Sequence, residues 1–141
     1  MDIKPCIGCW DCWAKTPGVC VLQDDMHLIL KHINHNDLLV FAAPFSMGFF
    51  HSFVKTVQER MIPLLLPYSE LVMGEMHHTL RYGTSPELAF IYKPEPDTDE
   101  EDVQINRDVF DRFALNFSST VVFFHSIKKS AMEIIHETVD F

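Results

Sequence analysis

Leu38-Leu39-Val40-Phe41-Ala42-Ala43 is an unbroken apolar run, and Pro44 ends it. A short and continuously apolar segment is typical of a strand that is covered on both faces of a parallel sheet. Two more runs of this kind occur at residues 87–92 and 120–124. The sequence therefore predicts three buried, parallel strands.

Helical patterns separate these strands. Apolar residues at helical spacing predict a helix over 26–33, with Asp24 as its cap, and further helices over about 49–61 and 99–117. Thr98 and Glu101 match a capping box at the start of the third. A closing helix is expected over 130–138, and residues 62–86 are expected to form an irregular insertion. Such alternation predicts an α/β fold with right-handed crossovers and helices on both sheet faces.

Length and charge limit the function. The 141 residues predict one domain, 1–141, in which a cysteine-rich loop (1–23) precedes the alternating part (24–141). The net charge of −9 argues against nucleic acid as a partner. No stretch reaches the ~20 apolar residues that cross a membrane, and the first residues carry no apolar signal core. We expect a cytoplasmic protein without a membrane partner.

All four cysteines lie within the first twenty residues, as Cys6, Cys9, Cys12 and Cys20. The first three follow the C-x2-C-x2-C spacing with which ferredoxin-type segments ligate iron–sulfur clusters. Structural zinc sites more often use two separated C-x2-C pairs, or cysteine with histidine. Free thiols in a buried turn are the main alternative to a cluster, and zinc and a disulfide are the others. A reducing compartment favours metal or redox chemistry over structural disulfides.

Ligands of parallel sheets bind beyond the carboxyl ends of the strands. The most site-like loop at these ends is Pro44-Phe45-Ser46-Met47-Gly48, which follows the first strand. Trp10 and Trp13 flank the thiols, where they either shield a cluster from solvent or pack an exposed loop.

These segments resemble the flavodoxin-like NADPH-dependent FMN reductase family, and within it the iron–sulfur flavoproteins. The resemblance is dense over residues 5–26, continues through 44–48 and Lys55 to Glu59-Arg60, and weakens after Arg81-Tyr82. It implies a flavodoxin-like three-layer α/β/α fold with a parallel sheet. It also implies that FMN contacts Pro44, Phe45, Ser46, Met47 and Gly48, and that a 4Fe–4S cluster is ligated by Cys6, Cys9, Cys12 and Cys20.

The chain departs from the family pattern at its start. It begins where the second strand of the family would be ending, so the first strand, the phosphate loop and the first helix are lacking. We therefore expect a domain that is incomplete at its amino end, with the edge of strand 38–43 left open. A homo-oligomer or a completing partner chain would cover that edge, unless a local segment around Ile3 pairs with it.

The resemblance implies an NAD(P)H-dependent FMN oxidoreductase that passes electrons to a small-molecule acceptor or to the cluster. No catalytic residue is identified from the sequence. Two alternatives stay open. One is a non-catalytic flavodoxin-like remnant or subunit, and the other is a small metal-binding domain without flavin.

Overall fold

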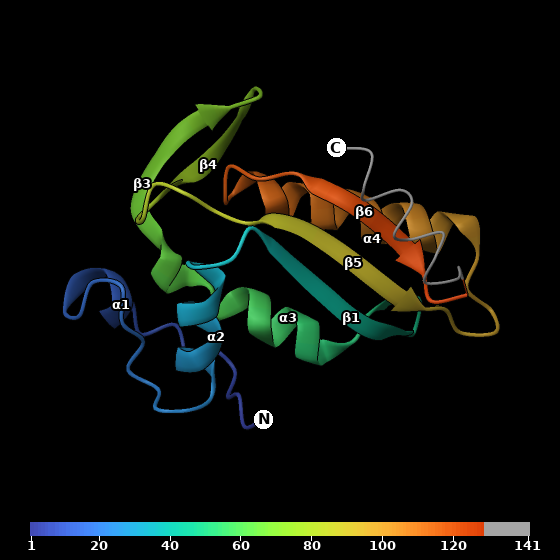
Figure 1. Ribbon diagram of the computed structural model, residues 1–141, viewed down its shortest axis with the longest axis horizontal. Helices are drawn as coiled ribbons and strands as arrows, with labels where there is room; N and C mark the ends of the chain where they lie inside the picture. Colours follow the sequence, from blue (N-terminus) through green and yellow to red (C-terminus); the bar gives the residue numbers. More distant parts are fainter. Residues whose placement is uncertain (129–141) are drawn as a thin grey trace.

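The computed structural model describes residues 1–128, which form a mixed α/β structure around a mostly parallel sheet (Figure 1). The strand order of this sheet is β2-β1-β5-β6. Strands β1 (Leu38–Ser46), β5 (Glu87–Lys93) and β6 (Val121–Ser126) run parallel, and the short β2 (Phe49–Phe50) turns back against the end of β1. The three predicted parallel strands are confirmed.

The helices lie close to their predicted positions. They are α2 (Met26–Ile33), α3 (Ser52–Glu59) and α4 (Glu100–Leu115). The short helix α1 (Asp11–Ala14) lies in the segment that was expected to be a loop, and a 3-10 turn, η1 (Ile62–Leu64), follows α3. Helix α3 begins later than expected because residues 49 and 50 pair with β1. The predicted closing helix over 130–138 lies outside the described residues.

The cap of α4 is one residue further along than predicted. The Asp99 carboxylate accepts a hydrogen bond from the Asp102 amide at 2.9 Å, and the Asp102 carboxylate accepts one from the Asp99 amide at 3.2 Å. Thr98 instead accepts a hydrogen bond from the Glu95 amide, at 2.9 Å. Aspartate satisfies exposed helix amides as well as threonine does, so the capping box formed at Asp99 and Asp102 rather than at Thr98 and Glu101.

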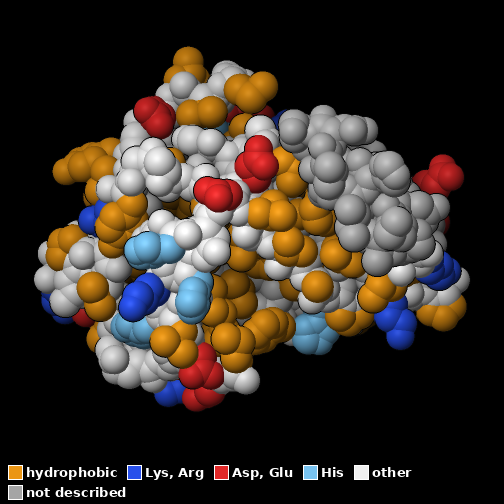
Figure 2. Space-filling view, viewed as in Figure 1, with side chains coloured by type: hydrophobic (Ala, Val, Ile, Leu, Met, Phe, Trp, Pro, Cys, Tyr) orange, Lys and Arg blue, Asp and Glu red, His pale blue; other side chains and the backbone are white. Residues whose placement is uncertain are grey.

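Within residues 1–128, β1 is covered on one face, whereas both faces were expected to be covered. Phe41 and Phe45 are buried on one face of the strand, whereas Leu38 and Val40 on the other face are 41% and 43% exposed. Figure 2 shows hydrophobic side chains gathered on this side of the molecule. Since α4 packs behind the sheet (Figure 1), the described helices do not cover both faces of β1.

The edge of β1 that faces away from β5 is open, as expected. Within residues 1–128, β2 pairs on that side with Phe45 and Ser46 alone, which leaves residues 38–44 without a neighbouring strand. Ile3 packs against the core but belongs to no strand. In the described structure, the segment around Ile3 therefore does not pair with β1.

Aromatic side chains form the centre of the core. Phe90 of β5 is fully buried and lies between Phe41 and Phe124 of the neighbouring strands, with ring centroids 6.5 and 5.3 Å away. Phe110 of α4 meets Phe90 edge-on at 5.1 Å. Phe50 of β2 adds a further contact at 4.9 Å. Phe90 thus connects the sheet to α4 and to the hairpin β1–β2.

The predicted irregular insertion is in fact a hairpin. Strands β3 (Leu65–Val72) and β4 (Glu75–Leu80) pair antiparallel and project from the sheet (Figure 1). Met73 and Gly74 both have positive φ angles, of 50° and 86°, which is the pattern of a tight hairpin turn. Proline at position 67 and a register shift between Leu65 and Ser69 interrupt the alternation that would have indicated strands.

No helix among the described residues is long and apolar enough to span a membrane.

Candidate functional site

The four cysteines line one pocket. Cys6 and Cys9 come from the loop before α1, Cys12 from α1 itself, and Cys20 from the segment before α2. The cavity between them has a volume of about 50 Å³. The remaining walls are apolar apart from the glycine backbone, and they are formed by Ile7, Gly8, Trp10, Val21, Leu22 and Ile62. All four cysteines are free thiols, and Cys9 is the exposed one.

Two left-handed residues turn the chain around this pocket. Gly8 has a φ of 65° and Trp10 a φ of 61°, so each of the first two intervals between cysteines contains one such residue. A left-handed conformation is unusual for tryptophan, and it marks a backbone held by its surroundings. The Trp10 carbonyl accepts hydrogen bonds from the amides of Trp13 and Ala14, which begins α1 directly after the turn. This geometry directs Cys6, Cys9 and Cys12 toward the same space.

The electrostatics of the thiols also show that they are close. The pKa of the Cys12 thiol is raised, first by its burial and then by the charges of Cys20, Cys6 and Cys9. Thiolates that repel one another favour binding of a positively charged group among them. Within residues 1–128, however, no group of three or more Cys, His, Asp or Glu side chains is placed to hold a metal ion. The sulfurs line a shared space without converging on one point.

A buried ion pair closes the loop that carries the cysteines. The guanidinium of Arg60, at the end of α3, binds both carboxylate oxygens of Asp24, with distances of 2.6 and 2.9 Å. The two side chains are 1% and 0% exposed. The Asp24 carboxylate also accepts the amides of Lys4 and Met26, at 3.0 and 3.1 Å. Arg60 in turn donates to the Lys4 carbonyl at 2.6 Å. We call this set of contacts the Asp24 clamp.

The Asp24 clamp places a positively charged group next to the thiols. The hydrogen bonds from Arg60 hold the pKa of the Asp24 carboxyl well below its usual range. Burial would lower the pKa of the Arg60 guanidinium, but its hydrogen bonds to Asp24 and the charge of Cys20 outweigh burial and raise it. A permanent positive charge therefore lies beside Cys20.

Asp24 was expected to be the cap of α2, which is correct only in part. Its carboxylate does accept the Met26 amide, but the cap position belongs to Asp25, whose side chain makes no capping bond. The main partner of Asp24 is Arg60, 36 residues away along the chain. Sequence spacing gives no signal for such a pair.

A second set of contacts holds the cysteine loop against the hairpin. The Trp13 indole donates to the Leu65 carbonyl at 2.9 Å. Arg81 donates to the carbonyls of Pro63, Leu65 and Cys12, at 2.9, 3.1 and 3.4 Å. Close packing also requires glycine at position 18, where a Cβ would lie 2.6 Å from the Tyr82 hydroxyl. The loop is thus fixed to β3 at one end and clamped by Asp24 at the other.

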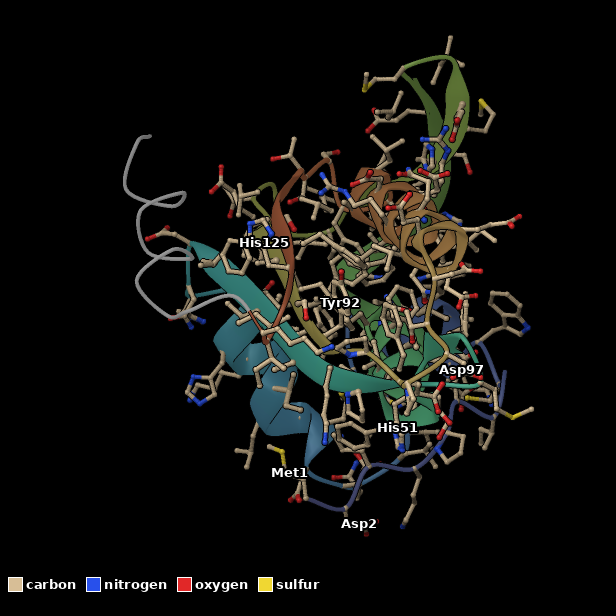
Figure 3. All side chains as sticks on the ribbon, turned by 90° about the vertical axis from the view of Figure 1, so that its right-hand side faces the viewer. Met1, Asp2, His51, Tyr92, Asp97 and His125 are labelled. Carbon is tan, nitrogen blue, oxygen red and sulfur yellow. The ribbon has the colours of Figure 1, made fainter. Side chains whose placement is uncertain are left out.

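The structure places the predicted flavin-contacting residues in a strand end and a tight turn. Pro44, Phe45 and Ser46 belong to β1, and Met47 and Gly48 connect it to β2. The Phe45 ring stacks on Tyr92 at 4.6 Å and is buried, and Figure 3 shows Tyr92 in the interior of the molecule. Phe45 is therefore not available to stack on a flavin in this arrangement.

Carboxylates surround the same turn. The Gly48 amide donates to Glu95 at 3.2 Å, and a Cβ at Gly48 would lie 2.8 Å from the Asp102 carboxylate. Negative charge here opposes a phosphate, so this turn does not fit the phosphate end of FMN. Binding of the flavin ring by Pro44, Ser46, Met47 and Gly48 stays a prediction.

The comparisons with known proteins give no relative: no family model matches the chain, and no curated protein matches it. What the observations define is a mixed α/β protein with a four-thiol pocket beside its sheet.

Proposed function

We propose that this chain is an electron-transfer protein in which Cys6, Cys9, Cys12 and Cys20 ligate an iron–sulfur cluster of the 4Fe–4S type. The observation that supports it most is that all four cysteines line a single, largely apolar pocket. Such a cluster supplies one-electron transfer when it is bound, and its potential depends on solvent exposure and nearby charge.

The donor set fits a cluster better than a single ion. A zinc ion needs four ligands at about 2.3 Å from one centre, and the described residues contain no such group. A cluster instead distributes its thiolate ligands around several iron atoms, which suits sulfurs that surround a space. Trp10 and Ile62 would exclude water from it, and the Arg60 charge next to Cys20 would stabilise the more negative, reduced state.

The fold supports a flavodoxin-like architecture as the finer form of this proposal. The parallel order β1-β5-β6 agrees with the last three strands of the family's sheet order, with the helical connections that the resemblance implies. The proposal retains FMN, NAD(P)H and a small-molecule acceptor as expectations from the resemblance. Because Phe45 is buried against Tyr92 and is not available to the flavin ring, we derive no step through FMN.

Anaerobic reconstitution with ferrous iron and sulfide tests the cluster. We expect a brown protein with about four irons per chain and a broad visible absorption that bleaches on reduction. Cys12→Ser should lose most of this iron, since Cys12 lies within the electrostatic reach of the other three thiols. Asp11→Asn is the matched control, because it alters the adjacent side chain and leaves every sulfur in place.

Two outcomes would contradict the cluster. One is a wild-type chain that stays colourless and takes up one zinc ion per molecule, which would favour the small metal-binding domain. The other is iron uptake that is equal in Cys12→Ser and the wild type.

The open edge of β1 favours a second candidate function, that of a subunit completed by another chain. On the side away from β5, residues 38–44 pair with no strand of the described structure, and Leu38 and Val40 are exposed next to that edge. An apolar strand edge of this kind invites pairing with a further strand.

Sedimentation velocity tests that association. We expect a dimer or larger assembly at micromolar concentration, and Val40→Lys should weaken association because it places a charge on the exposed face. Val109→Lys, on the exposed part of α4, is the control. A wild-type chain that stays monomeric across the concentration range would contradict the subunit function.

A further inference from the structure

The guanidinium of Arg60 has donor hydrogens that the Asp24 clamp does not use. Its Nη1 donates to the Lys4 carbonyl and to one oxygen of the Asp24 carboxylate, and its Nη2 donates to the other oxygen. A guanidinium carries five N–H donors in one rigid plane. One hydrogen on Nη2 and the hydrogen on Nε are therefore left over. The Nε atom is buried and has no hydrogen-bond partner within residues 1–128.

The two unused hydrogens lie along the same edge of the guanidinium plane. The edge formed by Nη1 and Nη2 faces the carboxylate of Asp24. The neighbouring edge, formed by Nε and Nη2, presents two nearly parallel N–H groups, which is the arrangement with which arginine binds an anionic acceptor. A buried donor without a partner costs free energy. This edge is therefore a place where an acceptor is expected.

The sulfur of Cys20 is an acceptor close to that edge. Burial would lower the pKa of the Arg60 guanidinium, but its hydrogen bonds to Asp24, the charge of Cys20 and a contact with the Cys20 sulfur raise it. The contact with the sulfur does not satisfy Nε, which still lacks a partner. A thiolate that is bound to iron carries more negative charge than a thiol, so it is the better acceptor for this edge.

The path of the chain agrees with this placement. Cys20 comes four residues before Asp24, to which Arg60 is bound, and Val21 and Leu22 between them line the thiol pocket. On the other side, Ile62 lines the pocket two residues after Arg60. Arg60 thus lies between the two segments that form this wall of the pocket.

Cys20 also needs support that the other cysteines do not. The left-handed turns at Gly8 and Trp10 direct the first three cysteines toward one space. Cys20 follows Cys12 only after seven intervening residues, so these turns do not set the direction of its sulfur. A donor edge held rigidly by the clamp can set that direction.

We propose that Arg60 is a positioning residue for Cys20, whose sulfur accepts hydrogen bonds from the Nε–Nη2 edge and is thereby held toward the other three sulfurs. The contact between the two side chains belongs to the chain itself. The consequence for a bound cluster rests on the proposed function. Hydrogen bonds to ligand sulfurs raise the reduction potential of an iron–sulfur cluster, because they stabilise the more negative, reduced state.

Nuclear magnetic resonance tests the contact in the reduced, metal-free chain. The chain has four arginines, each with one Nε–Hε cross-peak, and the peak of Arg60 is the one that is missing in Arg60→Lys. We expect this peak to move in Cys20→Ala, because Nε has lost the neighbouring sulfur. Cys9→Ala is the matched control, since Cys9 lines the same pocket but is the exposed thiol, and it should leave the peak in place. Cys20→Ser gives the same comparison if Cys20→Ala does not fold.

The reduction potential of the reconstituted protein tests the consequence. Arg60→Lys keeps a positive charge opposite Asp24 but has no second donor edge, so its potential should be more negative than that of the wild type. A merely structural role predicts the opposite sign, because a loosened loop admits water, which stabilises the reduced state. Arg107→Lys on α4 should leave the potential unchanged, since Arg107 binds Asp111 and does not line the thiol pocket.

Two results would overturn the proposal. One is an Arg60 cross-peak that has the same position in Cys20→Ala and the wild type, or that Cys9→Ala moves as far. The other is a potential in Arg60→Lys that equals or exceeds that of the wild type. If the wild type takes up no cluster, the proposed function is lost, whereas the cross-peak still decides whether Arg60 holds the Cys20 sulfur.

Discussion

Asp24→Ala is expected to lower the free energy of unfolding by about 3–5 kcal/mol, which is the usual cost of leaving one partner of a buried ion pair uncompensated. Arg60 is 1% exposed, so its charge cannot reach water when the carboxylate is removed. The amides of Lys4 and Met26 lose an acceptor at the same time. Urea unfolding followed by circular dichroism measures the change.

Two further variants show whether the buried charge is the cause. Asp25→Ala removes the neighbouring carboxylate, whose bond to the Asp2 amide is exposed, and should cost less than about 1 kcal/mol. Adding Arg60→Met to Asp24→Ala should recover part of the lost stability, because the unpaired charge is then gone. A double variant as unstable as the sum of the two single variants would contradict this explanation.

Acid should reduce the difference between the wild type and Asp24→Ala. The pKa of Asp24 is lowered in the folded state, so the unfolded chain takes up a proton that the folded protein does not. The stabilisation is then fully present above the ordinary carboxyl pKa of about 4 and is lost progressively as the pH falls below it. Unfolding measurements between about pH 7 and pH 3 should show this convergence. A difference that stays constant over this range would assign the effect to packing.

Phe90→Ala is the second substitution with a large expected effect, about 3–5 kcal/mol of unfolding free energy. The Phe90 ring is fully buried and contacts rings from β1, β2, β6 and α4. Its removal leaves a cavity at the point where the sheet meets α4, and so many neighbouring elements cannot all move inward to fill it.

Phe53→Ala on α3 is the matched control, because that ring is 43% exposed and leaves no buried cavity. We expect a loss of less than about 1.5 kcal/mol for it. Equal losses for the two variants in urea unfolding would contradict the central position of Phe90 in the core.

The elements of the sheet were predictable because their apolar runs are continuous and well separated. The predictions that were wrong depended on contacts between elements, which the local sequence pattern does not indicate. The run at residues 38–43 is as apolar as a fully covered strand, yet one of its faces is exposed, since coverage depends on where the helices pack. The hairpin β3–β4 was missed because Pro67 and a shifted register mask its alternation, although Met73-Gly74 was a local turn signal.

The same distinction holds for the candidate site, part of which was predictable from local spacing and part of which was not. Spacing alone indicated that Cys6, Cys9 and Cys12 face one space, and the structure places all four cysteines around it. The contacts of Arg60 with Asp24 and of Trp13 with Leu65 join distant parts of the chain, so no spacing rule could find them. The stretch at Pro44–Gly48 was predicted as a loop, but Phe49 and Phe50 fold back and pair with it.

The Asp24 clamp makes the stretch from Lys4 to Asp24 a ring that is already closed, because the Lys4 amide and the Asp24 carboxylate are 3.0 Å apart. The conformational entropy that loop closure costs is lost when the protein folds, and not when a ligand binds. Any group that the thiols bind therefore enters a loop whose ends are already held together. Opening the ring at Asp24 should weaken that affinity even though no sulfur has been changed.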